Sequence, residues 1–354
     1  MSSSTPSAAP SLIEFLRQSG IQLRIFDMGR RVSKISAELF HKVEQAQTPY
    51  PSPYLHHAWV SILLWNPKER AQSAVWFLKL PLDEQGFLVQ AARDDIMNRL
   101  LQNVTNAAEG SQNDALKDNP FSFKPEQEKM AIFHAYATQA TGAAPSQYYD
   151  FAKSYASGEQ GFSNWQSLGF QGIADLVVRF EEGNNTSHIA HAIEKMPHAP
   201  YEILCSCLEN ISLPHEVFSA LQKRFEKSLE EAGNQAPHIA AQIRGISMAK
   251  DYEGKVALLS KVLKSESAKD AEVLAAIATR CDSALRSPAL LQAYLEALAV
   301  SNAGQIGFSR ILADLMFMPD LRALILNAFR SEDRSPALTK AIGQMFGDNI
   351  ATKH

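Results

Sequence analysis

Apolar and polar residues alternate with a period of two in the first third of the chain. The segments 21–29, "IQLRIFDMG", and 30–36, "RRVSKIS", meet at the turn sequence "DMGR". Farther on, "AWVSILLW" at 58–65 and "SAVWFLKL" at 73–80 flank the turn sequence "NPKERA". Two such segments joined by a turn predict a β-hairpin, so this region predicts two hairpins. The second pair is apolar almost throughout, which indicates strands that are central in a sheet or buried on both faces.

Helical patterns precede, separate and follow these hairpins. Residues 12–18 predict a short helix, and Ser36 is positioned to cap a second one. A third amphipathic helix is predicted from 87 to 101, where apolar residues fall at helical spacing. The order of helix, two strands, helix, two strands and helix predicts a small α+β domain over residues 1–105. We expect a four-stranded, mostly antiparallel sheet with helices covering one face.

The pattern changes after residues 106–124, which are rich in Asn, Asp, Gln, Ser and Gly and predict a linker. From 125 to 354, strand patterns disappear and apolar residues recur every three or four positions, which predicts an all-α domain of about ten to twelve helices. "RSPAL" occurs at 286–290 and again at 334–338, each time where a helix should begin. We therefore predict a HEAT-like array of helical hairpins (an α-solenoid), with a compact bundle as the alternative.

Composition and charge exclude several classes of protein. The chain has 354 residues, of which 45% are hydrophobic and 20% charged, as is usual for a soluble globular protein of about two domains. Residues 1–105 hold 11 Lys and Arg against 9 Asp and Glu, and the remainder holds 23 against 29. Neither part is basic enough to predict a nucleic-acid partner. The longest apolar runs are far shorter than the roughly 20 residues of a membrane span, so none is predicted.

The cysteines and the first residues bear on the compartment. Cys205, Cys207 and Cys281 are the three cysteines, and such a small odd number argues against a disulfide framework and for a reducing environment. "MSSSTPSAAPS" at the start has no basic region followed by an apolar core, so no secretory signal is expected. Together these features predict a cytoplasmic protein.

No sequence fingerprint predicts a cofactor or a metal. Neither the Walker pattern nor the GxGxxG dinucleotide pattern occurs. His188 and His191 lie three apart in a predicted helix, but zincins require a spacing of four with a glutamate between the histidines. A polar helix face accounts for these two histidines better than a metal site.

Four carboxylates offer the strongest catalytic candidate: Asp83, Glu84, Asp94 and Asp95 lie within "LPLDEQGFLVQAARDD". As a functional group they would supply the general acid and base of a hydrolase. A structural role explains them without chemistry, because acidic residues are favoured near a helix start and Asp95 can pair with Arg99. The structural interpretation is favoured here, and the hydrolase is kept as the alternative.

Three aromatic residues, Phe162, Trp165 and Phe170, lie in the glycine-punctuated segment "SGEQGFSNWQSLGFQG". Aromatic side chains in such a segment most often anchor it to the domain. As the alternative they form part of a partner-binding surface, since Trp and Phe concentrate binding energy at interfaces. A further group, Arg24, Arg30, Arg31 and Lys34, surrounds the first hairpin and is explained by protection of a sheet edge.

The segment "VWFLKLPLDEQGFLVQAARDDIMNRLL", with "FLKLPLDEQG" and "AARDD" as its most characteristic parts, precedes an alanine-rich helical half. In this it resembles a family of uncharacterised bacterial proteins of about this length. The resemblance implies a bacterial cytosolic protein. It implies no activity, and it transfers no functional residue to this chain.

The function predicted from these observations is a non-enzymatic interaction or adaptor protein. A helical array offers a broad surface for another protein and needs no catalytic constellation.

Overall fold

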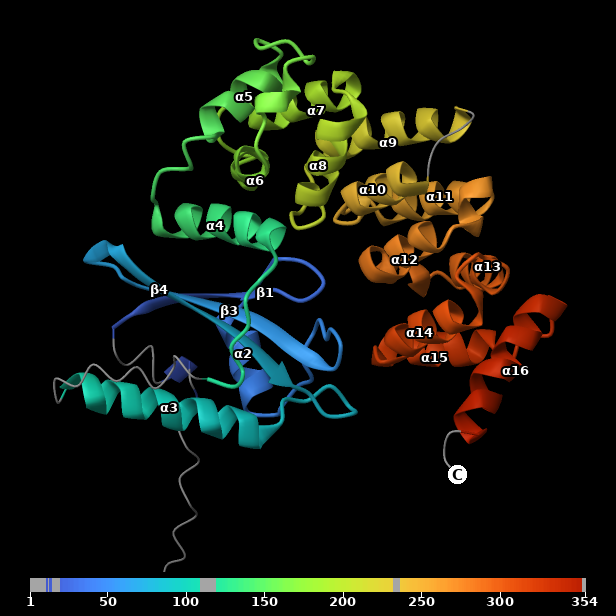
Figure 1. Ribbon diagram of the computed structural model, residues 1–354, viewed down its shortest axis with the longest axis horizontal. Helices are drawn as coiled ribbons and strands as arrows, with labels where there is room; N and C mark the ends of the chain where they lie inside the picture. Colours follow the sequence, from blue (N-terminus) through green and yellow to red (C-terminus); the bar gives the residue numbers. More distant parts are fainter. Residues whose placement is uncertain (1–10, 12, 15–19, 109–118, 232–235, 352–354) are drawn as a thin grey trace, which may run out of the picture. The chain divides into compact units, whose positions relative to one another are not determined.

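A computed structural model describes residues 11, 13–14, 20–108, 119–231 and 236–351. The chain forms two compact units, Met1–Ala144 and Pro145–His354 (Figure 1). The helix predicted over residues 12–18 lies largely outside the described residues.

The first unit contains one four-stranded antiparallel sheet in the order β2-β1-β3-β4. Its strands are β1 (Gln22–Asp27), β2 (Ser33–Ile35), β3 (His57–Asn66) and β4 (Glu69–Pro81). Both predicted hairpins are confirmed, as β1 with β2 and β3 with β4. Strand β3 pairs with β1 on one side and with β4 on the other, which explains its almost continuous apolar sequence.

Two helices cover one face of this sheet: α2 (Ala37–Glu44) and α3 (Gln90–Ala108). They share a core with residues of all four strands, including Ile62 and Leu80. Ser36 caps α2 as predicted, because its hydroxyl oxygen accepts a hydrogen bond from the backbone N–H of Leu39 at 3.1 Å. Helix α3 begins later than predicted, because Leu88 is still extended and pairs with Leu82.

The opposite face of the sheet is covered by α4 (Gln127–Thr141). Phe133 of α4 packs edge-on against Phe26 of β1 and Phe77 of β4, with ring centroids 5.5 and 5.3 Å apart. The helices predicted within residues 1–105 thus cover one face, as expected, and α4 adds a cover to the other face. Helix α4 lies within residues 125–354, which the sequence assigned to the helical domain, yet its aromatic side chains complete the sheet unit instead.

The predicted linker, residues 106–124, is partly structured. Helix α3 continues to Ala108, and residues 109–118 lie outside the described residues. Beyond them the chain returns to the sheet: Ser122 pairs with Leu78, and the backbone N–H of Lys79 donates to the carbonyl of Phe121 at 2.7 Å. These contacts cover part of the open edge of β4, the exposed side on which a strand would otherwise pair with another chain.

The described part of the second unit contains helices and no strands, as predicted. Its twelve α-helices are α5 (Tyr149–Ser157), α6 (Phe170–Val178), α7 (Asn185–Lys195), α8 (His198–Leu208), α9 (His215–Glu230), α10 (Ala236–Ile246), α11 (Tyr252–Leu263), α12 (Ala271–Arg280), α13 (Pro288–Ala299), α14 (Gly304–Met316), α15 (Pro319–Ala328) and α16 (Pro336–Ala351). Both "RSPAL" segments open a helix, since α13 begins at Pro288 and α16 at Pro336.

The helices of this unit form an array of two rows. In one row α5, α7, α9, α11 and α13 pack one on the next, and in the other α6, α8, α10, α12 and α14 do the same (Figure 1). Each helix thus contacts the second helix after it in the chain, and neighbouring helices connect the rows. The core lies between the two rows and includes fully buried side chains such as Tyr201, Phe225 and Tyr294.

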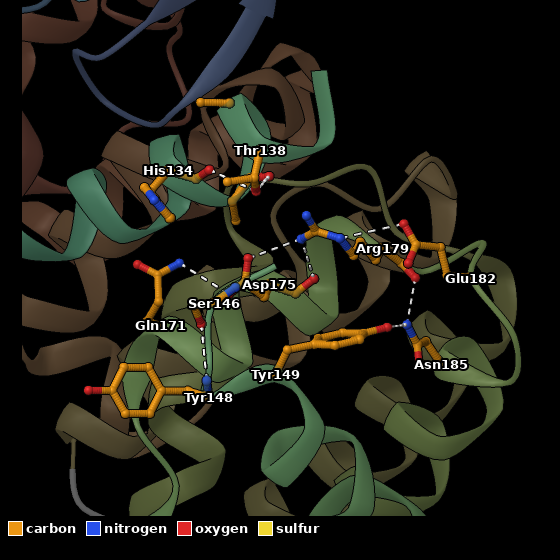
Figure 2. A network of polar contacts seen from close by, with 12 residues as sticks. His134, Thr138, Ser146, Tyr148, Tyr149, Gln171, Asp175, Arg179, Glu182 and Asn185 are labelled. Atoms are coloured by element: carbon orange, nitrogen blue, oxygen red, sulfur yellow. Dashed lines mark hydrogen bonds and ion pairs between the residues drawn. The ribbon is translucent and has the colours of Figure 1, made fainter. Parts of the chain in front are cut away.

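A buried polar network joins the first three helices of the array (Figure 2). The guanidinium of Arg179, at the end of α6, donates to the carboxylate of Asp175 at 3.0 Å. That carboxylate also accepts from the backbone N–H of Ser146 at 3.1 Å. The side chain of Asn185, at the start of α7, donates to the carbonyl of Arg179 at 2.7 Å and to the hydroxyl of Tyr149 in α5 at 2.9 Å. These bonds set the positions of α5, α6 and α7 relative to one another.

Candidate functional site

A surface cavity of about 300 Å³ opens where the end of α7 and the start of α8 meet α9. We name it the Arg224 pocket. Its described lining consists of Glu194, Met196, His198, Lys223, Arg224, Lys227, Ser228 and Glu231. Three cationic and two anionic side chains thus surround one small volume, so a ligand of this pocket would be recognised mainly by its charge.

Arg224 is held rigidly at this pocket. Its guanidinium stacks on the buried ring of Tyr201, with Cζ 3.7 Å from the ring centroid. The Nη1 atom donates to the carbonyls of Ile193 and Met196, at 2.6 and 2.9 Å. These bonds supply hydrogen-bond donors to backbone carbonyl groups at the C-terminal end of α7. Burial lowers the pKa of Arg224, yet an arginine keeps its charge throughout the physiological range.

One edge of this guanidinium remains available to a ligand. Within the described part of the chain, the hydrogen bonds of Arg224 all use Nη1, so Nε and Nη2 donate to no residue there. A guanidinium presents its N–H groups in a planar fork that matches the two oxygens of a carboxylate or phosphate. Because stacking and capping already hold the side chain, little conformational entropy is lost when an anion binds.

The remaining charges of the pocket form pairs at its rim. Lys223 bonds to Glu194 at 2.8 Å, and this hydrogen bond lowers the pKa of the Glu194 carboxyl. Lys227 lies 3.8 Å from Glu231 on the next turn of the chain. Both lysine side chains are exposed, so these pairs are weak and can exchange partners. Arg224 is therefore the one pocket cation, among the described lining residues, that lacks a carboxylate partner.

A histidine pair lies behind the pocket. Nδ1 of the buried His238, in α10, is 3.0 Å from a carboxylate oxygen of Glu202 and 3.2 Å from Nδ1 of His198. Within the described residues the buried Nε2 of His238 has no hydrogen-bond partner. A neutral imidazole protonated on Nδ1 accounts for both observations, and burial accordingly lowers the pKa of His238.

The thiol of Cys205, which interacts with Tyr201, is not suited to nucleophilic chemistry. Burial raises the pKa of Cys205 to about 12, so the thiolate is not populated at neutral pH. Cys205, Cys207 and Cys281 are all buried, as expected for cysteines that act as small apolar side chains. The pocket and its surroundings are thus built for binding through charge and hydrogen bonds.

The four candidate carboxylates are held separately. Asp83, Glu84 and Asp94 are exposed. Asp95 pairs with Arg99 at 2.9 Å, as predicted from their spacing. Asp94 lies 3.2 Å from Arg93, and no hydrogen bond joins any two of the four. This geometry lends no support to the alternative of a carboxylate-dependent hydrolase.

Asp83 stabilises the turn that follows β4. One of its carboxylate oxygens accepts the backbone N–H groups of Gln85 and Phe87, at 2.8 and 2.9 Å. We expect Asp83→Ala to lower the free energy of unfolding by about 1 kcal/mol, because two exposed hydrogen bonds are lost. Glu84→Ala should change it by less than about 0.5 kcal/mol. Urea unfolding of both variants, with Asp83→Asn as the control that retains an acceptor, tests this; a much larger loss would give these carboxylates another role.

The predicted aromatic residues are placed in two ways. Phe162 anchors its loop: its ring packs edge-on against Tyr155 with centroids 5.5 Å apart, and its carbonyl accepts from the Tyr155 hydroxyl at 3.0 Å. Trp165 opens the short 3₁₀ helix η1 (Trp165–Ser167) and is half-buried, as is Phe170 at the start of α6. All three residues are partly exposed, so a partner-binding role for Phe162, Trp165 and Phe170 stays a prediction.

The Arg224 pocket was missed in the sequence because its parts are far apart in the chain. Tyr201 and Arg224 contact each other across 23 positions, in different helices. One local signal was present: Val217, Leu221, Arg224 and Ser228 occupy one stripe of α9 at helical spacing. An arginine within an otherwise buried stripe is unusual and indicates a fixed position for its charge.

Comparison with known proteins identifies the family. Neither a curated protein nor a solved structure matches the chain. No helix of the described residues is long and apolar enough to cross a membrane. Among the described residues, no group of three or more His, Cys, Asp or Glu side chains could hold a metal ion. A family match covers residues 8–346, nearly the whole chain. The chain therefore belongs to the family described as protein of unknown function (DUF3549).

Proposed function

We propose that this protein is a non-enzymatic interaction protein, an adaptor whose helical array binds an acidic group of a partner protein in the Arg224 pocket. The observation that carries the proposal is the guanidinium of Arg224, which is immobilised on Tyr201 and has one edge free in a surface cavity. A carboxylate is the natural partner of such an edge, because two parallel N–H···O bonds form at once.

The rim of the pocket favours a protein ligand over a polyanion. Glu194 and Glu231 flank the cavity and would repel the successive charges of a nucleic acid or polyphosphate. A protein segment with a single acidic residue satisfies both conditions: its carboxylate binds Arg224, and it brings no second negative charge close to the two glutamates. Partner specificity then comes from this charge pattern.

The architecture supports the same function. In each of the two rows, a helix packs on the helix that comes two places later in the chain. This is the arrangement expected of an α-solenoid of HEAT type, which presents a broad surface to other proteins. Three buried cysteines, an odd and small number for a chain of this length, suit a cytoplasmic protein. We therefore include an α-solenoid architecture and a cytoplasmic location in the proposal.

The test is capture of partners from native cell extract on the full chain, with matched variants. Arg224→Gln removes the fork, and Lys227→Glu inverts an exposed charge at the rim. Lys264→Glu is the control, because it makes the same charge change on an exposed lysine just after α11. We expect a partner retained by the wild type and the control, and bound at least about tenfold less by both pocket variants.

Because Arg224 also caps α7, Arg224→Gln can disturb the fold, and circular dichroism of each variant must accompany the capture. The exposed Lys227 keeps the test decisive in that event. Equal capture by the wild type and Lys227→Glu would remove the pocket from the interaction. Trp165→Ala, tested beside them, shows whether the aromatic loop contributes to the same partner.

A further inference from the structure

We propose that the sheet unit carries a second docking surface, which binds an acidic segment of a partner protein that also bears an aliphatic side chain. We name it the Trp59 surface and define it by Tyr54, Leu55, Trp59, Lys79, Phe123 and Lys129. All six belong to Met1–Ala144, so the inference is independent of the Arg224 pocket.

The first observation is a strained turn that exposes an apolar residue. Tyr54 and His57 exchange both backbone hydrogen bonds, each at 3.0 Å, and so close a two-residue turn. The two residues within it, Leu55 and His56, have φ of 49° and 58°. Asn, Asp and Gly normally occupy such positions, because a larger side chain strains the backbone there. The Leu55 side chain is nevertheless 58% exposed, so neither packing nor backbone preference accounts for a leucine at this turn.

Aromatic rings form the floor beside this turn. The Trp59 ring lies 6.1 Å from that of Tyr54 and packs edge-on with Phe123 at 4.8 Å. The indole N–H of Trp59 donates to the carbonyl of Tyr54 at 2.9 Å, which ties the floor to the strained turn. All three rings are partly exposed. Large rigid side chains of this kind lose little entropy when they are covered by a partner.

Cations surround the rings. The ammonium of Lys79 lies 4.6 Å from the centre of the Trp59 ring, and that of Lys129 lies 5.8 Å from the Tyr54 ring. Within the described residues, Lys79 has no carboxylate partner. Lys129 donates to the carbonyl of Gly29 at 2.6 Å and lies 3.7 Å from the exposed Glu126. The surface is therefore net positive and its cations are already positioned, which favours an anionic ligand.

Two features select an acidic protein segment over single-stranded nucleic acid. Bases bind such surfaces by stacking on open ring faces. Here the Lys79 ammonium lies over Trp59, and Phe123 packs edge-on against the same ring. The exposed aliphatic side chain of Leu55 is matched best by an aliphatic side chain of a protein, whereas a nucleic acid offers flat bases on a charged backbone.

The experiment is selection of 12-residue peptides from a random phage-displayed library on the immobilised full chain. We expect the selected peptides to combine Asp or Glu with an aliphatic residue. Leu55→Gly and Lys79→Glu should each weaken their binding by about tenfold, as for a central contact of an interface. Lys68→Glu, an exposed lysine between β3 and β4, provides the same charge change away from the surface and should leave binding within about twofold.

Leu55→Gly separates binding from folding. Glycine adopts positive φ without strain, so this variant should melt at a higher temperature than the wild type while binding the peptides more weakly. Peptides that bind all variants equally, or a library that yields only basic peptides or none, would overturn the proposal. So would a Lys79-dependent affinity for oligothymidine greater than that for the selected peptides.

Discussion

Replacing Asp27 with asparagine is expected to raise the free energy of unfolding at pH 8 by about 2 to 4 kcal/mol, and to change it little at pH 4. Asp27 ends β1 and is 1% exposed. One carboxylate oxygen accepts the Tyr50 hydroxyl at 2.6 Å, and the other has no hydrogen-bond partner among the described residues. Asparagine keeps the acceptor for Tyr50 and removes the charge.

The sign follows from the direction of the pKa shift. Burial raises the pKa of Asp27 from 3.8 to about 7, although the Tyr50 and Gly29 hydrogen bonds and the charges of Arg31 and Lys129 act in the opposite direction. The folded protein therefore holds the proton more tightly than the unfolded chain. The stability that this protonation contributes is complete below pH 3.8 and is lost as the pH rises to about 7.

Chemical unfolding of the wild type and Asp27→Asn between pH 4 and pH 8 measures the effect. The difference between the two curves isolates Asp27 from other titrating groups, and it should grow across this range and then level off. Glu126→Gln is the control, because it removes an exposed carboxylate near Lys129. Parallel curves for the wild type and Asp27→Asn would show that Asp27 has an ordinary pKa in the folded protein.

Arg179→Met is expected to destabilise the first helices of the array by about 3 to 5 kcal/mol. This is the usual cost of removing one partner of a buried ion pair, because the other charge stays buried. The side chains of Arg179 and Asp175 are 2% and 0% exposed. Without the guanidinium, the Asp175 carboxylate stays buried with the N–H of Ser146 and the amide of Gln171 as its donors. Asp175→Leu should also destabilise these helices, but by less, because Arg179 keeps its ion pair with the partly exposed Glu182 at 3.5 Å.

The double variant Asp175→Leu with Arg179→Met should be more stable than either single variant, because no charge remains uncompensated. Amide hydrogen exchange of α5, α6 and α7 measures this locally, which matters in a chain of two units that can unfold separately. The exposed pair of Arg286 and Asp320, 3.2 Å apart, supplies the control: Arg286→Met should cost less than about 1 kcal/mol. Costs of the two single variants that simply add in the double variant would contradict a coupled pair.

Much of the fold was predictable because local patterns carry it. The period of two gave both hairpins, and the period near 3.6 gave the helical unit. Ser36 and the two "RSPAL" segments marked helix starts through capping chemistry, which depends only on neighbouring residues. Asp95 and Arg99 were paired correctly because four residues is one turn of a helix.

The buried state of Asp27 and the position of helix α4 could not be predicted in the same way. Asp27 in "FDMG" has the sequence of an ordinary turn aspartate, and it becomes a buried acid because Tyr50, 23 residues later, reaches it. Helix α4 looked like the first helix of the array, but Phe133 and Tyr136 have a sheet face to cover, with Phe26 as their contact. An amphipathic pattern predicts that one face of a helix is buried, but it does not predict which surface that face packs against.

The sequence by itself therefore determined the type and order of most elements, the helix starts marked by capping residues, and the absence of a known catalytic pattern. The tertiary structure decided which face covers which, and it brought Arg224 onto Tyr201 and Lys129 to Gly29 across 100 positions. The physical reason is the separation along the chain over which each interaction acts. Backbone periodicity and capping act over a few residues, whereas the burial and charge that define a site depend on where the whole chain returns.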